Sequence, residues 1–279
     1  MKKRSPIAAG RAVPAFLLAV LLILSCIPCA AADAIWRISD DTRIFWASTP
    51  DSQRTDDALM AQIRLFSSEL TAKVTGQSPG IYYGSAEYAG EHDILLLLDR
   101  TLEIPAEGYR IDISGGQARI SASDADGLFY GCRDLIRQLL IDGTVSPREE
   151  APEAAERSLS LDCGRKYYTV DWIKELIREL SWANMNALVL HFSEEMGFGI
   201  ESKTYGWLAG RDGTLGTQNE AVTDPRYLTQ DEIAELVKYA ALYHIEIIPS
   251  LDSPGHLNYL IKKFNEQCAD NDFSFTYNG

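Results

Sequence analysis

Hydrophobic and polar positions in the first half of the chain alternate at strand spacing over several short segments. The apolar ranges 34–38 and 44–47 predict short strands, and the continuous apolar run 94–98 predicts a strand covered on both faces. Two alternating segments, 109–113 and 118–122, flank a Ser-Gly-Gly turn and predict a β-hairpin. We therefore expect a β-sheet in this part of the protein.

Two stripes of apolar residues at helical spacing interrupt these strands. Each predicts a helix with one buried face, and their members are Leu59, Ile63, Phe66, Leu70 and Val74 in the first and Leu128, Cys132, Leu135 and Leu139 in the second. Together with the strands they predict a small α+β domain over residues 33–145. Residues 146–156 contain two prolines and four glutamates without hydrophobic periodicity, which predicts a linker.

After residue 156 the pattern changes to strands that alternate with amphipathic helices. Strands are predicted at 159–162, 187–192 and 245–251, with a helix in each interval. The second helix is expected to begin at a capping box formed by Thr229 and Glu232. Such alternation predicts parallel βαβ units, which occur in doubly wound sheets and in TIM barrels.

Polar side chains cluster where each of these three strands ends. In a TIM barrel the carboxyl ends of the strands build the active site, so this placement favours a barrel. No phosphate-binding glycine motif accompanies any strand, and a nucleotide-binding doubly wound sheet loses support accordingly. We expect the first part of a TIM barrel over residues 157–279, and the polar residues at its strand ends are Asp162, Arg165, His191, Ser193, Glu194, Glu195, Asp252, Ser253 and His256.

The composition is that of an ordinary globular protein with an acidic surface. Of the 279 residues 46% are hydrophobic and 24% are charged, and the formal net charge is −14. The only four charged residues among the first 32 are basic, so the remaining chain is more acidic still. An acidic body repels phosphate backbones and anionic lipid, so we expect no nucleic-acid partner and favour a neutral substrate.

The N-terminus has the pattern of an export signal. A basic start precedes the apolar run 15–24 and the small residues 29–32, so residues 1–32 are predicted to be a cleaved signal peptide. The run is shorter than the roughly 20 residues that a membrane-spanning helix needs, and no stable membrane span is expected. Acylation at Cys26, which would tether the protein to a membrane, is a minor alternative.

The cysteine pattern indicates no disulfide framework and no zinc site. Only Cys132, Cys163 and Cys268 follow the signal segment, an odd number without C-x-x-C or histidine-rich spacing. We therefore expect neither a metal nor another cofactor.

Three ordered segments on the predicted strands resemble motifs of glycoside hydrolase family 20. Residues 157–168, RSLSLDCGRKYY, resemble the opening strand of that family, with the form L-D-x-x-R. Residues 184–195, NMNALVLHFSEE, resemble its K-x-N-x-L-x-x-H-x-x-D segment, and residues 248–256, IPSLDSPGH, resemble I-P-E-x-D-x-P-G-H. Upstream, residues 107–113 and 126–131 resemble the small domain that precedes the barrel in these enzymes.

The resemblance implies a β-N-acetylhexosaminidase, or an enzyme that releases a disaccharide such as lacto-N-biose. Such enzymes release terminal β-linked N-acetylglucosamine or N-acetylgalactosamine from glycans and retain the anomeric configuration. The substrate's own 2-acetamido oxygen acts as nucleophile, while a paired aspartate and glutamate supply orientation and acid catalysis. A glycan or oligosaccharide is then the expected partner.

The resemblance also assigns roles to individual residues. Arg165 matches the arginine that holds sugar hydroxyls, with a surface salt bridge as its alternative. His256 matches the histidine that supports the catalytic pair. Asp252 is either a hydrogen-bond acceptor for this cluster or the N-cap of the following helix, and His191 either lines the pocket or sits satisfied within the barrel layer.

Several positions depart from the family pattern. Glu194 stands where aspartate is common, Ser250 replaces a glutamate, and Phe198-Gly199 stands where Trp-Arg is frequent. Residues 210–227 are rich in Gly, Asp and Thr and are expected to form a long loop over the barrel mouth, with an insertion of no defined role as the alternative. Trp207 ahead of them is expected in the core rather than as a sugar platform.

No segment of the chain resembles the H-x-G-G-D-E context of the family's catalytic pair, so no catalytic residue is assigned. Residues 157–279 are about half of what a TIM barrel needs, and an N-terminal fragment of an enzyme is the expectation. The alternative is a noncatalytic or degenerate glycan-binding protein. A family 18-like chitinase is disfavoured, because its D-x-x-D-x-D-x-E strand is absent.

Overall fold

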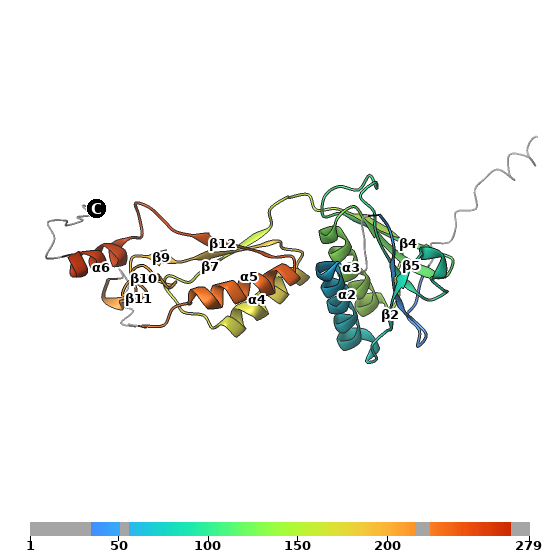
Figure 1. The fold of residues 1–279 in the computed structure, drawn as a ribbon, viewed down its shortest axis with the longest axis horizontal. Coiled ribbons are helices and arrows are strands. Elements are labelled where there is room, and N and C mark those ends of the chain that lie inside the picture. The colour runs from blue at the N-terminus through green and yellow to red at the C-terminus, as the bar shows by residue number, and fades with distance from the viewer. Residues whose placement is uncertain (1–34, 51–55, 216–223, 269–279) are drawn as a thin grey trace, which may run out of the picture.

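The computed structural model describes residues 35–50, 56–215 and 224–268. Figure 1 shows two parts side by side: an N-terminal sheet with two helices on one of its faces, and a C-terminal unit of parallel strands and helices. The predicted signal peptide lies outside the described residues.

The N-terminal domain is built on a six-stranded mixed sheet with the order β2-β1-β3-β5-β4-β6. Strands β2, β1, β3 and β5 are parallel to one another, whereas β4 is antiparallel to both β5 and β6. The β4–β5 pair is the predicted hairpin. The bounds are β1 Ile44–Ala47, β2 Ile81–Gly84, β3 Ile94–Leu98, β4 Tyr109–Ser114, β5 Gln117–Ala122 and β6 Arg148–Glu150.

Helices α2 (Asp57–Leu70) and α3 (Ala125–Asp142) bury the two predicted apolar stripes against this sheet, except Val74, which lies beyond α2 and is half-buried. Each begins at an aspartate N-cap, Asp56 and Asp124, whose side chain accepts a hydrogen bond from a backbone N–H of the first turn. A single π-helical turn continues α2 over Thr71–Thr75, and a short 3₁₀ turn covers Ala86–Tyr88.

Two predictions for this domain need correction, and one strand was missed. Of the predicted strand 34–38, the described residues 35–38 form no regular strand, and Trp36 makes only an isolated bridge to Val145. Within the predicted linker, Arg148–Glu150 is strand β6 and extends the sheet beside β4. Strand β2 was not predicted, because Ile81–Gly84 has no period-two burial pattern: its residues are mostly half-buried on both faces.

The C-terminal unit contains the three parallel strands that the sequence predicts. Strands β7 (Ser158–Asp162), β8 (Ala187–His191) and β12 (Glu246–Ser250) form a sheet in the order β12-β8-β7. Helix α4 (Val170–Trp182) connects β7 to β8, and α5 (Gln230–Leu242) lies between β8 and β12 in the chain. The capping box at Thr229 and Glu232 is present as predicted.

Beyond the carboxyl end of β8 lies a second, antiparallel sheet that the sequence did not predict. It consists of β9 (Ser193–Glu194), β10 (Gly197–Phe198) and β11 (Gly210–Arg211). A 3₁₀ turn follows at Gly213–Leu215, and helix α6 (Asn258–Cys268) packs against β9 and β10. The predicted loop 210–227 therefore begins with a strand, and its residues 216–223 lie outside the described part of the chain.

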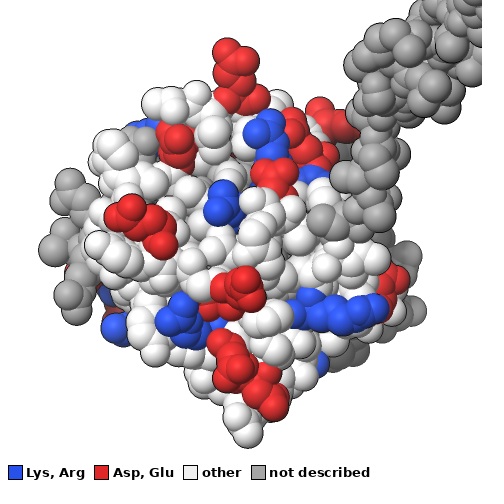
Figure 2. Space-filling view, turned by 90° about the vertical axis from the view of Figure 1, so that its right-hand side faces the viewer, with Lys and Arg blue, Asp and Glu red and all other residues white. Residues whose placement is uncertain are grey.

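At the end of the molecule formed by the N-terminal domain, acidic and basic side chains are interspersed among uncharged ones (Figure 2). Neither sign gathers into a large patch on this face. Within the described residues, no helix is long and apolar enough to cross a membrane.

Candidate functional site

The strand register brings the polar residues of the three motifs to one end of the parallel sheet. Asp162 is paired with His191 across β7 and β8, and His191 is paired with Ser250 across β8 and β12. All three residues stand at the carboxyl ends of their strands. Residues that follow these positions in sequence, including Arg165, Glu194 and His256, meet beyond this edge.

Glu194 is the centre of this cluster. Its side chain is 3% exposed, and one carboxylate oxygen lies 2.6 Å from Nη2 of Arg165. The other oxygen lies 2.8 Å from Nδ1 of His256 and accepts a hydrogen bond from the backbone N–H of Glu195 at 3.0 Å. A buried carboxylate needs such partners, because an unpaired charge away from water is costly. Glu194 therefore links residues of all three motifs, Arg165 through an ion pair and His256 through a hydrogen bond.

Arg165 is held by two carboxylates while remaining half exposed. Asp162 accepts from the backbone N–H of Arg165 at 2.9 Å and from its Nη1 at 2.7 Å. Burial lowers the pKa of Arg165, but the bond to Asp162 and the nearby negative charges outweigh it and leave the pKa raised. The guanidinium stays charged and presents its remaining donors to solvent.

His191 and Asp252 border the same cluster. Nδ1 of His191 lies 3.3 Å from Oγ of Ser250, and Nε2 lies 3.6 Å from a carboxylate oxygen of Glu194. Oδ1 of Asp252 is 3.8 Å from Nδ1 of His191. Helix α6 begins only at Asn258, so the alternative that Asp252 is its N-cap is wrong. The alternative role as an acceptor stays a prediction, because the carboxylate lies near His191 but beyond hydrogen-bond distance.

Trp207, predicted in the core, is half-buried at the edge of a small apolar cluster. Its ring meets that of Phe264 edge to face with centroids 5.2 Å apart, inside a small cluster that includes Phe198 and Tyr259. This cluster joins the antiparallel sheet to helix α6.

Sequence reasoning missed Arg211, which the structure buries beside the first motif. Its guanidinium donates hydrogen bonds to the carbonyl oxygens of Cys163 and Arg226. No spacing or motif signals this contact, because Arg211 follows a stretch without regular periodicity. The sequence alone offered no means of finding it.

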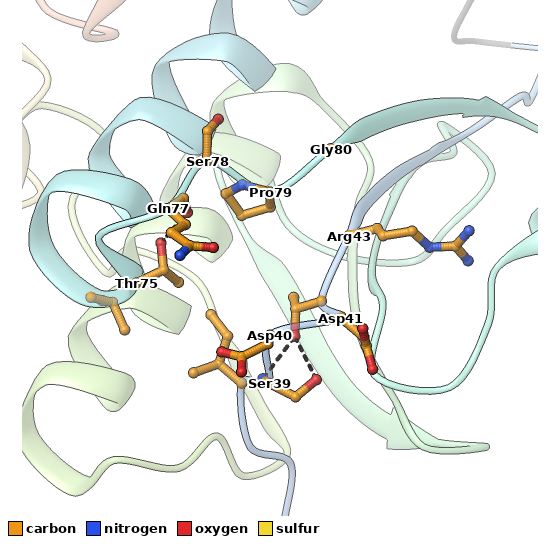
Figure 3. A pocket seen from close by; sticks show the side chains of 12 residues that line it. Ser39, Asp40, Asp41, Arg43, Thr75, Gln77, Ser78, Pro79 and Gly80 are labelled. Carbon is orange, nitrogen blue, oxygen red and sulfur yellow. Dashed lines mark hydrogen bonds between the residues drawn. The ribbon is translucent and has the colours of Figure 1, made fainter.

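One pocket of about 410 Å³ lies away from this cluster. It is lined by residues 38–43, 74–75 and 77–80, and none of them belongs to the three-stranded sheet (Figure 3). Its labelled residues are polar apart from Pro79 and Gly80, and the Thr42 hydroxyl accepts from the backbone N–H of Ser39 within it. Among the described residues, no three His, Cys, Asp or Glu side chains gather as metal ligands would.

Comparisons with known proteins agree with the motifs. Residues 156–278 match "Glycosyl hydrolase family 20, catalytic domain", and residues 36–154 match "Glycosyl hydrolase family 20, domain 2". A β-hexosaminidase of Vibrio furnissii is 29% identical over 210 residues, covering 71% of this chain and 34% of that protein. A lacto-N-biosidase of Bifidobacterium bifidum is 29% identical over 246 residues, covering 85% and 19% respectively.

A solved structure leads to the same conclusion. The N-acetyl-β-hexosaminidase of Streptomyces plicatus superposes with a TM-score of 0.69 at 28% identity, covering 88% of this chain and 48% of that one. The chain thus spans less than half the length of these relatives, and its three parallel strands correspond to part of their barrel. Both domains, the order of the motifs and the architecture agree: the chain belongs to glycoside hydrolase family 20.

Proposed function

We propose that this chain carries the N-terminal domain and part of the sugar-binding site of an exo-acting β-N-acetylhexosaminidase. The observation that carries the proposal is the buried carboxylate of Glu194, which bonds Arg165 at 2.6 Å and His256 at 2.8 Å at the carboxyl ends of the parallel strands. In a barrel enzyme this edge is where substrate binds.

Arg165 is the residue proposed to bind the terminal sugar. Its guanidinium is fixed by Asp162 and Glu194, yet about half of its side chain remains accessible. A planar, permanently charged group with several donors suits adjacent sugar hydroxyls. Because its partners hold it in place beforehand, little side-chain entropy is lost when a sugar binds.

His256 and Glu194 are proposed to support the acid catalyst. Glu194 accepts from Nδ1, which makes Nδ1 the protonated nitrogen and leaves Nε2 as the atom for a second carboxyl group. That carboxyl group would belong to the catalytic aspartate–glutamate pair, for which this chain contains no matching segment. His191 and Asp252 are proposed to border this pair, with His191 Nε2 3.6 Å from Glu194 and the Asp252 carboxylate 3.8 Å from His191 Nδ1.

The chemistry proposed is retaining hydrolysis assisted by the substrate. The 2-acetamido oxygen attacks the anomeric carbon as the leaving oxygen is protonated, and water then opens the cyclic intermediate. Neither step needs a metal. We also propose that the protein is exported, on the basis of the signal pattern in residues 1–32.

The test uses the product of the complete reading frame, purified and shown to be folded. We expect it to release p-nitrophenol from p-nitrophenyl β-N-acetylglucosaminide or p-nitrophenyl β-N-acetylgalactosaminide, or to release lacto-N-biose from p-nitrophenyl β-lacto-N-bioside. If folded protein leaves all three substrates intact, the proposal fails. Binding of N-acetylglucosamine without hydrolysis would instead favour the noncatalytic alternative.

A further inference from the structure

Arg211 is a buried arginine in strand β11, outside the three motifs. Its side chain is 5% exposed, and its donors reach two segments that are distant from each other in sequence. Nη1 donates to the carbonyl oxygen of Arg226 at 2.5 Å, and Nη2 donates to the carbonyl oxygen of Cys163. Cys163 comes two residues before Arg165.

The turn 163–165 is confined from two further sides. The backbone N–H groups of Cys163 and Gly164 both donate to the carbonyl oxygen of His191, at 2.8 and 2.9 Å. Strand β10 closes the other side, because a Cβ at Gly197 would lie 2.4 Å from the Gly164 oxygen and one at Gly199 would lie 2.2 Å from the Cys163 oxygen. No side chain at Gly197 or Gly199 would fit here, so the turn packs directly against the backbone of residues 197–199.

From these contacts we infer that Arg211 is a positioning residue for Arg165. By fixing the Cys163 carbonyl it sets the path of the turn, and thereby the point from which the Arg165 side chain reaches Asp162 and Glu194. This inference rests on the proposed role of Arg165 in binding the sugar. Arg211 itself touches neither Arg165 nor the carboxylates of the cluster in any recorded hydrogen bond or ion pair of the described residues.

The guanidinium group suits this role better than an amine. Two carbonyl oxygens that approach from different segments match the planar fork of arginine, whereas a lysine ammonium is a point donor at the end of a flexible stem. Burial lowers the pKa of Arg211, and the negative charge of Asp224 opposes this effect. The antiparallel sheet thus supplies a buried cation whose donors hold backbone rather than substrate.

The first test measures the turn itself and does not depend on activity. In Arg211→Met we expect the amides of Cys163 and Gly164 to exchange about tenfold faster, while the amides of β4 keep their wild-type protection. Arg211→Lys should give an intermediate rate. The control is Arg226→Met, which removes an exposed arginine beside the same contact and leaves in place the backbone carbonyl oxygen that Arg211 bonds. Unchanged exchange in folded Arg211→Met, or equal acceleration in the control, would overturn the inference.

The second test is a double-mutant cycle in the complete enzyme. We expect Arg211→Met to lower kcat/KM about 100-fold in the wild-type background, since a displacement of about 1 Å has that effect on positioned groups. In an Arg165→Met background, adding Arg211→Met should lower kcat/KM by less than about threefold, because the two residues act as one unit. Equal losses in both backgrounds would assign Arg211 a general structural role and refute the inference.

The two proposals fail in different ways. Arg165→Met without loss of kcat/KM contradicts the proposed sugar contact, and with it the inference. A complete protein that hydrolyses none of the three substrates contradicts the proposed function, while the exchange measurement still decides whether Arg211 holds the turn.

Discussion

At the scale of single residues, Glu194 illustrates how a buried charge is tolerated. One of its oxygens forms an ion pair with Arg165 and the other accepts from His256, and the side chains of these partners are 51% and 42% exposed. Since both partners can return to water, losing the carboxylate should cost less than the roughly 3–5 kcal/mol of a fully buried pair.

We predict that Glu194→Gln lowers the free energy of unfolding by about 1–3 kcal/mol and weakens binding of N-acetylglucosamine. The amide keeps the volume of the side chain, but its NH₂ group must face a donor from either the arginine or the histidine. Urea denaturation and calorimetric titration of the complete protein measure the two effects. Glu195→Gln is the matched control, and equal losses in the two variants would argue against a special role for Glu194.

The sequence identified most of the residues that meet in the cluster, because they stand in short motifs at strand ends. It could not choose between the alternatives for Asp252, since the start of helix α6 depends on packing against β9 and β10. Arg211 lay beyond prediction for a similar reason. Its contacts with Cys163 and Arg226 exist only once the antiparallel sheet has formed.

At the scale of elements, local signals were most reliable where a helix begins. Thr229 accepts from the backbone N–H of Glu232 at 3.1 Å, and the Glu232 carboxylate accepts from the backbone N–H of Thr229 at 2.7 Å. Both bonds satisfy donors that a helix start would leave open. The three parallel strands were equally predictable, because short apolar segments that alternate with amphipathic helices are typical of βαβ units.

Thr229→Ala should therefore lower the free energy of unfolding by about 1 kcal/mol. The change removes the cap of α5 without altering the buried stripe of that helix. Chemical denaturation measures the loss, and Thr204→Ala, at an exposed position outside any helix, should change stability by less than about 0.5 kcal/mol. If the two variants lose equal stability, the capping box contributes nothing measurable.

The strand errors have a common physical cause. Arg148–Glu150 is exposed along its whole length and has no apolar face to reveal it, yet it bonds to β4 through its backbone. The apolar residues of 34–38 suggest a strand, but Trp36 is buried in the core while making only one bridge. Whether such a segment forms a strand depends on pairing partners that are distant in sequence, and hydrophobic periodicity does not reveal those partners.

At the scale of the whole molecule, Arg133 of α3 joins the two domains. Its Nη2 donates to Glu69 of α2 at 2.9 Å, and its guanidinium lies 3.9 Å from the ring centroid of Trp182 at the end of α4. The side chain is 1% exposed, so both the ion pair and the cation–π contact are shielded from water. His244 makes a second connection, with Nδ1 lying 2.5 Å from a carboxylate oxygen of Asp126.

Arg133→Met should destabilise the protein more at neutral pH than at acidic pH. Burial raises the pKa of Glu69 and the charge of Arg133 opposes this effect, so removing the arginine raises the pKa further. A carboxylic acid whose pKa is raised by folding costs no stability at a pH below its pKa in the unfolded protein, because it is then protonated in both states. The cost grows as the pH rises from the pKa in the unfolded protein toward the pKa in the folded protein.

The unfolding free energy of wild type and Arg133→Met, measured by urea denaturation at several pH values, tests this prediction. We expect the difference to reach about 1–3 kcal/mol near neutral pH, where the largely buried Glu69 carboxylate would lose its arginine and keep only Lys73 nearby, and to shrink on acidification. The double variant Glu69→Gln/Arg133→Met is compared with the single variant Glu69→Gln. The difference in their unfolding free energies should not depend on pH. A difference that stays constant between acidic and neutral pH would mean that Arg133 joins the domains through its ring contacts and not through its charge.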